Sequence, residues 1–350
     1  MNVDLLARLC ETPGVPGREE RVRALIEGEI GGLFDSVETD AMGSLICTRN
    51  SRTGNDDAAT VMLLCHMDEI GFFVSHIDEN GFLWINNVGG FDTRNLFSRR
   101  VLVCTESGDI PAVMNPGGKP VHIASPEDRK KVPEISEFFV DTGMNKDEVK
   151  KKVQIGDYIV MDEPFKQMGE KLVSKALDNR VACWLGIESI RQLDKAGVQH
   201  DAKIVVSFTV QEEVGLRGAK TSSYAVRPDI GIGLDVTLAC DTPGVPKQET
   251  CTVHGEGFAL HIKDSSFISD YALTNEFQKI AEGNNIKFQR SILSGGGQDG
   301  AAAQQAAAGA RAIGITVGTR YIHTVTEMCD KGDLEAARNI LAEYLAQAKK

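Results

Sequence analysis

Two adjacent glutamates, Glu212 and Glu213, are the residues of this sequence that most directly suggest chemistry. They follow the apolar run 203–210, which predicts a buried strand. Because successive side chains of a strand point to opposite faces, neighbouring glutamates at its end can take different roles. One can hold a metal while the other moves a proton. An isolated Glu-Glu pair is more often a solvated turn, so its role depends on the residues that gather around it.

Three further apolar runs are each followed by a side chain that can bind a metal. The runs and the residues that follow them are 61–65 with His66, 229–234 with Asp235, and 312–317 with His323. Runs of this kind suit strands that are buried on both faces in an α/β sheet. Ligands of such sheets bind just beyond the carboxyl ends of the strands. We therefore expect these side chains to meet the two glutamates at one rim of the sheet.

Two aspartates are candidates for the same rim. Asp178 lies at a junction between a loop and a predicted helix, where it could equally cap a helix that begins at Asn179. Asp68 lies two residues beyond His66, so in an extended chain both side chains project to the same side. Asp68 can then accept the second N–H of the imidazole and fix the orientation of the ring.

The candidate ligands are two histidines and three carboxylates, with no cysteine among them. The histidines are His66 and His323, and the carboxylates are Asp178, Asp235 and one of the two adjacent glutamates. This mixture suits a divalent transition metal, and it fits Zn, Co or Mn better than Ca or Mg. A single ion would use only three or four of the ligands. Five ligands around a central aspartate suit two ions roughly 3.5 to 4 Å apart that share a carboxylate and a bridging water. Such a pair lowers the pKa of the water and polarises a substrate carbonyl.

Helical periodicity and apolar strand-like runs alternate along most of the chain, which favours an α/β fold with a sheet layered between helices. The predicted helices cover residues 3–10, 19–30, 179–195, 271–284, 300–310 and 332–348. Residues 69–165 differ, because turn signals separate short strand-like stretches and only residues 145–153 read as helical. We therefore predict a β-rich insertion at 69–165 within a catalytic domain formed by residues 1–68 and 166–350.

The composition excludes several classes of function. The formal net charge of −12 and the lack of a strong basic cluster argue against nucleic acid as a partner. Because no run of about 18 apolar residues and no hydrophobic signal core occurs, we expect no membrane association and a cytoplasmic location. The eight cysteines lack C-x-x-C spacing, which favours reduced thiols over disulfides or a cysteine-zinc site. Small or peptidic substrates are expected.

Five motifs together resemble the glutamyl or deblocking aminopeptidase family of dinuclear metallopeptidases, which includes the tetrahedral aminopeptidases and the FrvX-like and SgcX-like proteins. The motifs are Cys-His-Met-Asp-Glu-Ile-Gly at 65–71, Lys-Ala-Leu-Asp-Asn-Arg at 175–180, Gln-Glu-Glu-Val-Gly-Leu-Arg-Gly-Ala at 211–219, Gly-Leu-Asp-Val at 233–236 and Arg-Tyr-Ile-His-Thr-Val-Thr-Glu-Met at 320–328. The resemblance runs nearly from end to end, and it includes Phe-Val-Asp-Thr-Gly at 139–143 inside the predicted insertion.

The resemblance implies a role for each candidate ligand. Asp178 would bridge two metal ions. His66 and Asp235 would complete one site, and Glu213 and His323 would complete the other. Two divalent ions per subunit are thus expected, with zinc ahead of cobalt or manganese.

The resemblance also implies roles for the remaining two carboxylates. Glu212 would be the general base that takes a proton from the bridging water and passes it to the leaving amine. Asp68 would match the family's carboxylate that contacts a metal ligand but does not bind the metal itself. The family fold is an α/β catalytic domain with a β-rich insertion of PDZ-like or barrel character. Its members form dimers and hollow tetrahedral dodecamers, which the insertion helps to build.

The predicted function is a cytoplasmic, dinuclear metal-dependent aminopeptidase that hydrolyses N-terminal residues from short peptides. One alternative is a related metal-dependent amidohydrolase or deacylase that acts on N-acyl or other small amides. A further alternative, from a different class, is a non-catalytic assembly protein. Each candidate ligand and the candidate base are intact, which favours the enzyme.

Residues 294–300 depart from the family pattern, because they read Ser-Gly-Gly-Gly-Gln-Asp-Gly where many members have Gly-Gly-Thr-Asp-Ala. A glycine-rich backbone before a helix could bind a substrate carbonyl or an anion. The same residues could equally form a flexible loop in which Asp299 caps the helix. Arg217 and Arg320 are candidates for favouring acidic substrate side chains, although surface salt bridges would explain them as well.

Overall fold

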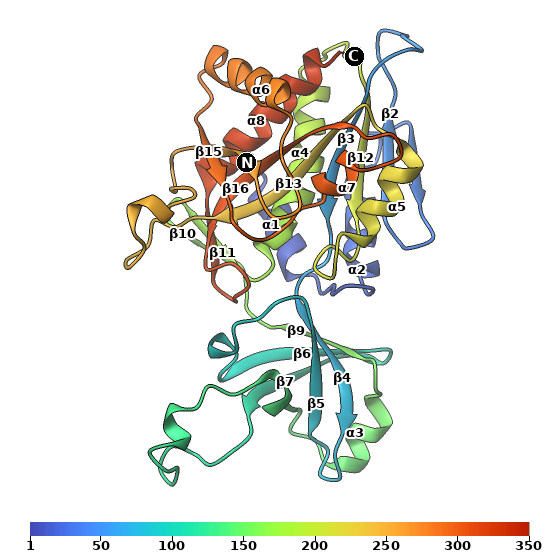
Figure 1. Cartoon of the computed structure of the whole chain (residues 1–350). Helices are drawn as coiled ribbons and strands as arrows, with labels where there is room; N and C mark the ends of the chain where they lie inside the picture. Colours follow the sequence, from blue (N-terminus) through green and yellow to red (C-terminus); the bar gives the residue numbers. More distant parts are fainter. Residues whose placement is uncertain (350) are drawn as a thin grey trace.

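A computed structural model describes residues 1–349, which form one large mixed sheet with its helices and, beside it, a closed barrel (Figure 1). The strands of the large sheet are β1 (Ser36–Thr39), β2 (Leu45–Arg49), β3 (Thr60–His66), β10 (Lys166–Met168), β11 (Lys171–Ser174), β12 (Lys203–Thr209), β13 (Ile230–Leu238), β14 (Phe258–Lys263), β15 (Phe288–Ile292), β16 (Arg311–Arg320) and β17 (Glu327–Asp330). Their order is β1-β2-β12-β3-β13-β16-β17-β11-β10, and β14 joins β15 to β16.

The four central neighbours β12, β3, β13 and β16 run parallel to one another. Thr209 at the end of β12 lies opposite His66 at the end of β3, and Asp235 on β13 lies opposite Thr316 on β16. The carboxyl ends of these strands therefore meet at one edge of the sheet, as the apolar runs of the sequence predict.

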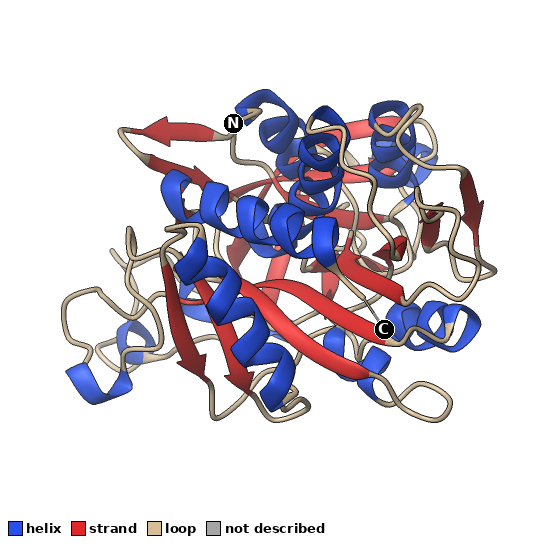
Figure 2. Cartoon of the chain, turned by 90° about the horizontal axis from the view of Figure 1, so that it is seen from above, coloured by secondary structure: helices blue, strands red, loops and turns tan. Residues whose placement is uncertain are grey.

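Helices cover the two faces of the large sheet (Figure 2), whereas α3 (Lys146–Lys152) packs against the barrel. The other helices are α1 (Val3–Glu11), α2 (Glu20–Glu29), α4 (Leu177–Lys195), α5 (Arg217–Val226), α6 (Tyr271–Gly283), α7 (Gly300–Gln304) and α8 (Lys331–Gln347). Short 3-10 turns occur at Thr93–Asn95, Asp128–Lys130, Ile135–Glu137 and Lys247–Glu249. The mixed α/β fold with an inserted barrel is confirmed. Within residues 1–349, no helix is both long and apolar enough to cross a membrane.

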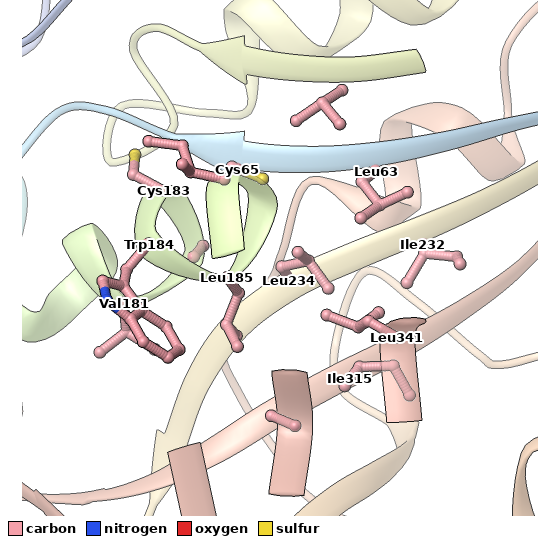
Figure 3. Packing of buried hydrophobic residues seen from close by; sticks show 14 of the residues in the cluster. Leu63, Cys65, Val181, Cys183, Trp184, Leu185, Ile232, Leu234, Ile315 and Leu341 are labelled. Atoms are coloured by element: carbon pink, nitrogen blue, oxygen red, sulfur yellow. The ribbon is translucent and has the colours of Figure 1, made fainter. Parts of the chain in front are cut away.

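Alternating residues of the central strand β3 pack into separate hydrophobic clusters on the two faces. Leu63 and Cys65 belong to the large cluster that includes Trp184 of α4 (Figure 3). Met62 and Leu64 belong to a smaller cluster on the opposite face, with alanines of α5 and α7. Because side chains of a strand alternate between faces, a continuous apolar run such as this one is buried on both.

The barrel has a hydrophobic core of its own, which contains Phe72, Val101 and Val140. Its strands are β4 (Gly71–Ile77), β5 (Leu83–Val88), β6 (Arg99–Thr105), β7 (Gly108–Pro116), β8 (Phe138–Asp141) and β9 (Tyr158–Met161), closed in the order β4-β5-β8-β7-β6-β9. All six strands lie within the predicted insertion. The exact domain boundaries remain a prediction.

The predicted helix over residues 300–310 is wrong beyond Gln304. Ala307 and Gly309 have φ angles of 50° and 92°, so the backbone leaves the helical conformation. The backbone N–H of Ala310 instead donates to the carbonyl of Gln304 at 3.2 Å. The helix propensity of an alanine-rich segment is outweighed here, because the chain must turn back to begin β16 at Arg311.

Gly186 allows α4 to lie close against the sheet. A Cβ atom at this position would lie 2.9 Å from Cys65 Sγ and 3.1 Å from Val206 Cγ1. We expect Gly186→Ala to lower the free energy of unfolding in urea by about 1–3 kcal/mol, because a close-packed core cannot absorb the extra methyl group. The control is Gly28→Ala on α2, where nothing lies within 4 Å of the added atom. This control should be neutral or stabilise by about 0.5–1 kcal/mol, and an equal loss in both variants would contradict the packing argument.

Candidate metal centre

The predicted ligands and the predicted base line one cavity of about 780 Å³ at the carboxyl edge of the central strands. The residues concerned are His66, Asp178, Glu212, Glu213, Asp235 and His323. The remaining predicted site residue, Asp68, is fully buried behind the cavity wall. The structure therefore brings together residues from five separate segments of the chain.

Asp178 lies at the centre of this group. Its Oδ1 is 3.3 Å from His66 Nε2, and its Oδ2 is 3.4 Å from His323 Nε2. The same nitrogen of His323 lies 3.4 Å from Glu213 Oε1, whereas His66 Nε2 lies 3.8 Å from Glu212 Oε2. One aspartate thus faces both histidines, which themselves come from different strand ends.

Potential donor atoms converge in three overlapping groups, within each of which the atoms lie within 4.8 Å of one another. The groups are His66 with Glu212 and Glu213, His66 with Asp178 and Asp235, and Asp178 with Glu213 and His323. Imidazole nitrogens and carboxylate oxygens are donors suited to divalent transition metals. The residues present therefore fit divalent metal ions, and Asp178 is shared by two of the groups.

The backbone at the start of α4 leaves the Asp178 side chain free to face the cavity. Asp178 and Asn179 have non-helical φ/ψ values, which mark a kink inside this segment. Asn179 caps the following turn, because its Oδ1 accepts the N–H of Ala182 at 3.1 Å. Its Nδ2 also donates to the carbonyl of Leu234 at 2.9 Å, which ties the kink to β13. The capping role considered for Asp178 therefore falls to its neighbour.

The turn that carries the two glutamates is held by buried carboxylates. The two oxygens of Asp68 accept the backbone N–H groups of Glu212 at 3.0 Å and Glu213 at 3.1 Å. The preceding N–H, that of Gln211, is bonded at 3.0 Å to Glu19, which is also buried. His66 Nδ1 lies 3.1 Å from the carbonyl of Asp68 and 3.5 Å from its carboxylate. Asp68 thereby links the orientation of the His66 ring to the position of the glutamate turn.

The wall of the cavity brings four carboxylates, those of Asp178, Glu212, Glu213 and Asp235, close to one another. Burial is the main cause that raises the pKa of Glu212 and of Asp235 well above their usual values. Burial lowers the pKa of His323, but the hydrogen bonds that its ring donates to the carboxylates of Asp178 and Glu213 outweigh this effect and raise the pKa to about 11. Carboxylates packed in this way are stabilised by a nearby cation, which agrees with the donor chemistry.

The glycine-rich segment 294–297 lines the cavity, but Asp299 does not cap the helix that follows. Its buried Oδ2 instead accepts a hydrogen bond from Thr209 Oγ1 at the end of β12. Gln298 fills the space between this loop and the sheet, where a Cβ atom at Gly233 or Gly314 would collide with its side chain. Glycine at these two strand positions is therefore needed to accommodate Gln298.

Neither of the two arginines considered for substrate binding lines the cavity. Arg320 forms two bonds to Asp241, at 2.6 and 2.7 Å, and Arg217 Nη1 bonds Gln211 at 3.3 Å. Lys220 lines the cavity instead, with its Nζ donating to the carbonyl of Gly215 at 2.9 Å. The sequence does contain a signal for Lys220. A helix that starts directly after the glutamate turn places its first turn at the carboxyl edge of the sheet, beside the cavity.

Comparison with known proteins identifies the relatives of this chain. The sequence profile described as M42 glutamyl aminopeptidase matches residues 43–340. A putative aminopeptidase of Acetivibrio thermocellus is 34% identical over 98% of this chain and 98% of its own length. The solved aminopeptidase APDkam598 of Desulfurococcus kamchatkensis is 34% identical with a TM-score of 0.92, covering 99% of this chain and 95% of that one.

A third relative is named for its assembly. The Pyrococcus horikoshii TET1 peptidase, described as assembling into a tetrahedron or a large octahedral shell, is 29% identical with a TM-score of 0.86. The match covers 98% of both chains. The resemblance found in the sequence motifs is thus confirmed over nearly the whole length of the chain.

Proposed function

Because this chain belongs to the M42 glutamyl aminopeptidase family, we propose that it removes N-terminal residues from short peptides at a centre of two divalent metal ions. The observation that carries this proposal is the position of Asp178 between His66 and His323 in a cavity large enough for the end of a peptide. A deacylase or a non-catalytic assembly protein is not favoured, since the relatives are aminopeptidases and the candidate ligands and base are intact.

We assign each ion to one of the donor groups that share Asp178. His66 and Asp235 would complete one site, and Glu213 and His323 would complete the other. Zinc is proposed as the native ion, and cobalt or manganese would suit the same donors. When bound, the ions supply an activated water and polarise the scissile carbonyl.

Glu212 is proposed to move the proton. Its carboxylate lines the cavity beside His66, and its main chain is fixed by the hydrogen bond to Asp68. One Glu212 oxygen accepts a proton from the attacking water and then delivers it to the nitrogen of the leaving amine. Asp68 contributes by holding the glutamate turn and the His66 ring in register.

The walls of the cavity away from the ligands suggest which N-terminal side chains fit. They are mainly apolar, with Val236, Leu238 and Ile322 among the lining residues. Among the described residues, Lys220 is the one lysine or arginine in the lining. We therefore propose that apolar and acidic N-terminal side chains are favoured over basic ones.

The test is an assay of metal-reconstituted protein on leucyl, glutamyl and lysyl anilides and on N-acetyl-leucyl anilide. We expect turnover on the leucyl and glutamyl substrates and none on the acetylated one. Lys220→Met should lower kcat/KM for the glutamyl anilide about 10-fold, as for a lost bond between charged groups, and leave the leucyl anilide unchanged. Arg217→Met on the same helix turn is the control and should change neither. The absence of turnover on every free-amine substrate would refute the proposed function.

We propose that the chain forms homo-oligomers, from dimers to a tetrahedral dodecamer. The similarity to the TET1 peptidase supports this, and the barrel extends away from the large sheet, where it can contact other copies (Figure 1). Light scattering of the purified chain measures the assembly, and a monomer at micromolar concentration would contradict it.

A further inference from the structure

Glu327 joins two parts of the candidate metal centre through its carboxylate. It is the first residue of β17 and is 2% exposed. Its Oε2 accepts the backbone N–H of Asp178 at 3.0 Å, and its Oε1 accepts the backbone N–H of His323 at 2.7 Å. One side chain therefore holds the main chain of two residues that lie far apart in the sequence.

Both of these main-chain positions depart from regular structure, and that of His323 is strained. Asp178 lies at the kink where α4 begins, with φ −79° and ψ 103°. His323 lies in the turn after β16 with a φ of 65°, a left-handed conformation that costs energy for a residue other than glycine. A hydrogen bond to each N–H stabilises these two conformations, and it fixes the distance between the side chains that face each other across the centre.

The position of Glu327 is itself well determined. Its backbone lies in the sheet, paired with Ser174 of the neighbouring strand β11. Glu327 forms no ion pair within residues 1–349, since the nearby Lys175 bonds both oxygens of Glu69 at 2.8 Å. Burying a carboxylate without a cation beside it costs free energy of folding, and the two backbone N–H groups offset only part of that cost. We therefore take these two hydrogen bonds as contributions to the candidate metal centre.

The opposite side of the centre uses the same device. Asp68 accepts the N–H groups of Glu212 and Glu213, as described above. Two buried carboxylates thus hold four of the six residues that line the centre by their main chains. We propose that Glu327 is a positioning residue that sets the metal affinity of the Asp178–Glu213–His323 group. This inference rests on the proposed function, because it assumes that these residues bind metal ions.

The proposal is tested with Glu327→Gln. The amide retains one acceptor oxygen but turns an NH2 group toward the other backbone N–H, so one of the two bonds is lost. Titration of the apo-protein with Co²⁺, followed by calorimetry and by visible absorption of the bound ion, should show an affinity about 10- to 100-fold weaker at one of two sites. The absorption band of that ion should also shift, because the positions of its ligands change.

Asp333→Asn is the matched control. Asp333 is 1% exposed and likewise accepts two backbone N–H groups, those of Gly255 at 2.8 Å and Gly257 at 2.7 Å, yet it does not line the cavity. This variant should lower the melting temperature of the apo-protein without changing Co²⁺ affinity or absorption. If Glu327→Gln does not fold, Glu327→Asp serves instead, since the shorter carboxylate cannot reach both N–H groups.

The outcomes separate the two proposals. A wild-type chain that binds no Co²⁺ would refute the proposed metal centre. A wild-type chain that binds two ions, together with a Glu327 variant that binds both with unchanged affinity and spectrum, would overturn the positioning role alone. Glu327 would then be a structural residue of the same kind as Asp333.

Discussion

Replacing Glu212 with glutamine is expected to lower kcat about 100- to 10,000-fold, the range that a positioned acid or base contributes. Glutamine has nearly the same shape, so the turn and its bonds to Asp68 should persist. It cannot accept the proton from the attacking water. The measurement is kcat and KM on leucyl anilide, together with the ion content of each preparation by elemental analysis.

Two results would contradict this role for Glu212. Activity within threefold of the wild type would show that another group moves the proton. Loss of an ion together with loss of activity would make Glu212 a ligand, which is a geometric alternative because it also lies in a donor group with His66 and Glu213. Unchanged ion content with strongly reduced kcat separates the base from a ligand.

Replacing Asp178 with asparagine is expected to have the largest effect on metal binding. Two of the three donor groups contain Asp178, and its two oxygens face different histidines. A neutral amide offers a single oxygen and no charge, so the affinity for both ions should fall at least about 100-fold. This loss exceeds the one expected when a residue that contacts a ligand, but not the ion, is replaced. Activity at micromolar metal should fall with it.

Asp241→Asn is the control for this variant. It removes a carboxylate of the same size whose bonds to Arg320 lie outside the cavity lining. Ion affinity measured by calorimetry should not change in the control. If Asp178→Asn retained two tightly bound ions, the shared ligand would have to be a different residue.

The sheet and most helices could be predicted because their signals are local. The apolar runs before His66 and Asp235 are continuous, which is typical of strands buried on both faces, and β3 and β13 indeed lie at the centre of the sheet. The convergence of the strand ends then follows from parallel pairing. The length of α7 could not be predicted, because the return of the chain at Ala307 is set by where β16 must begin.

The site residues likewise divide into those that local sequence predicts and those whose role depends on contacts with distant parts of the chain. Side chains at strand ends could be found from their spacing. For Asp178 the sequence fits a ligand and a helix cap equally well, and only the hydrogen bond from Ala182 to Asn179 assigns the cap to its neighbour. Glu327 stands in the motif at 320–328, but its role could not be predicted, since one of the two backbone N–H groups that it binds belongs to Asp178, far away in the sequence. The partners of Arg320 are equally non-local, because Asp241 lies in another loop.

The most direct test is a stepwise titration of the metal-free chain with Zn²⁺ or Co²⁺ while hydrolysis of leucyl anilide is followed. We predict no hydrolysis without metal, activity that rises with each equivalent bound and saturates at two ions per chain, and no cleavage of the N-acetylated substrate. Hydrolysis at full rate in the presence of a chelator, or an inactive chain with two ions bound, would contradict a metal-dependent aminopeptidase at this site.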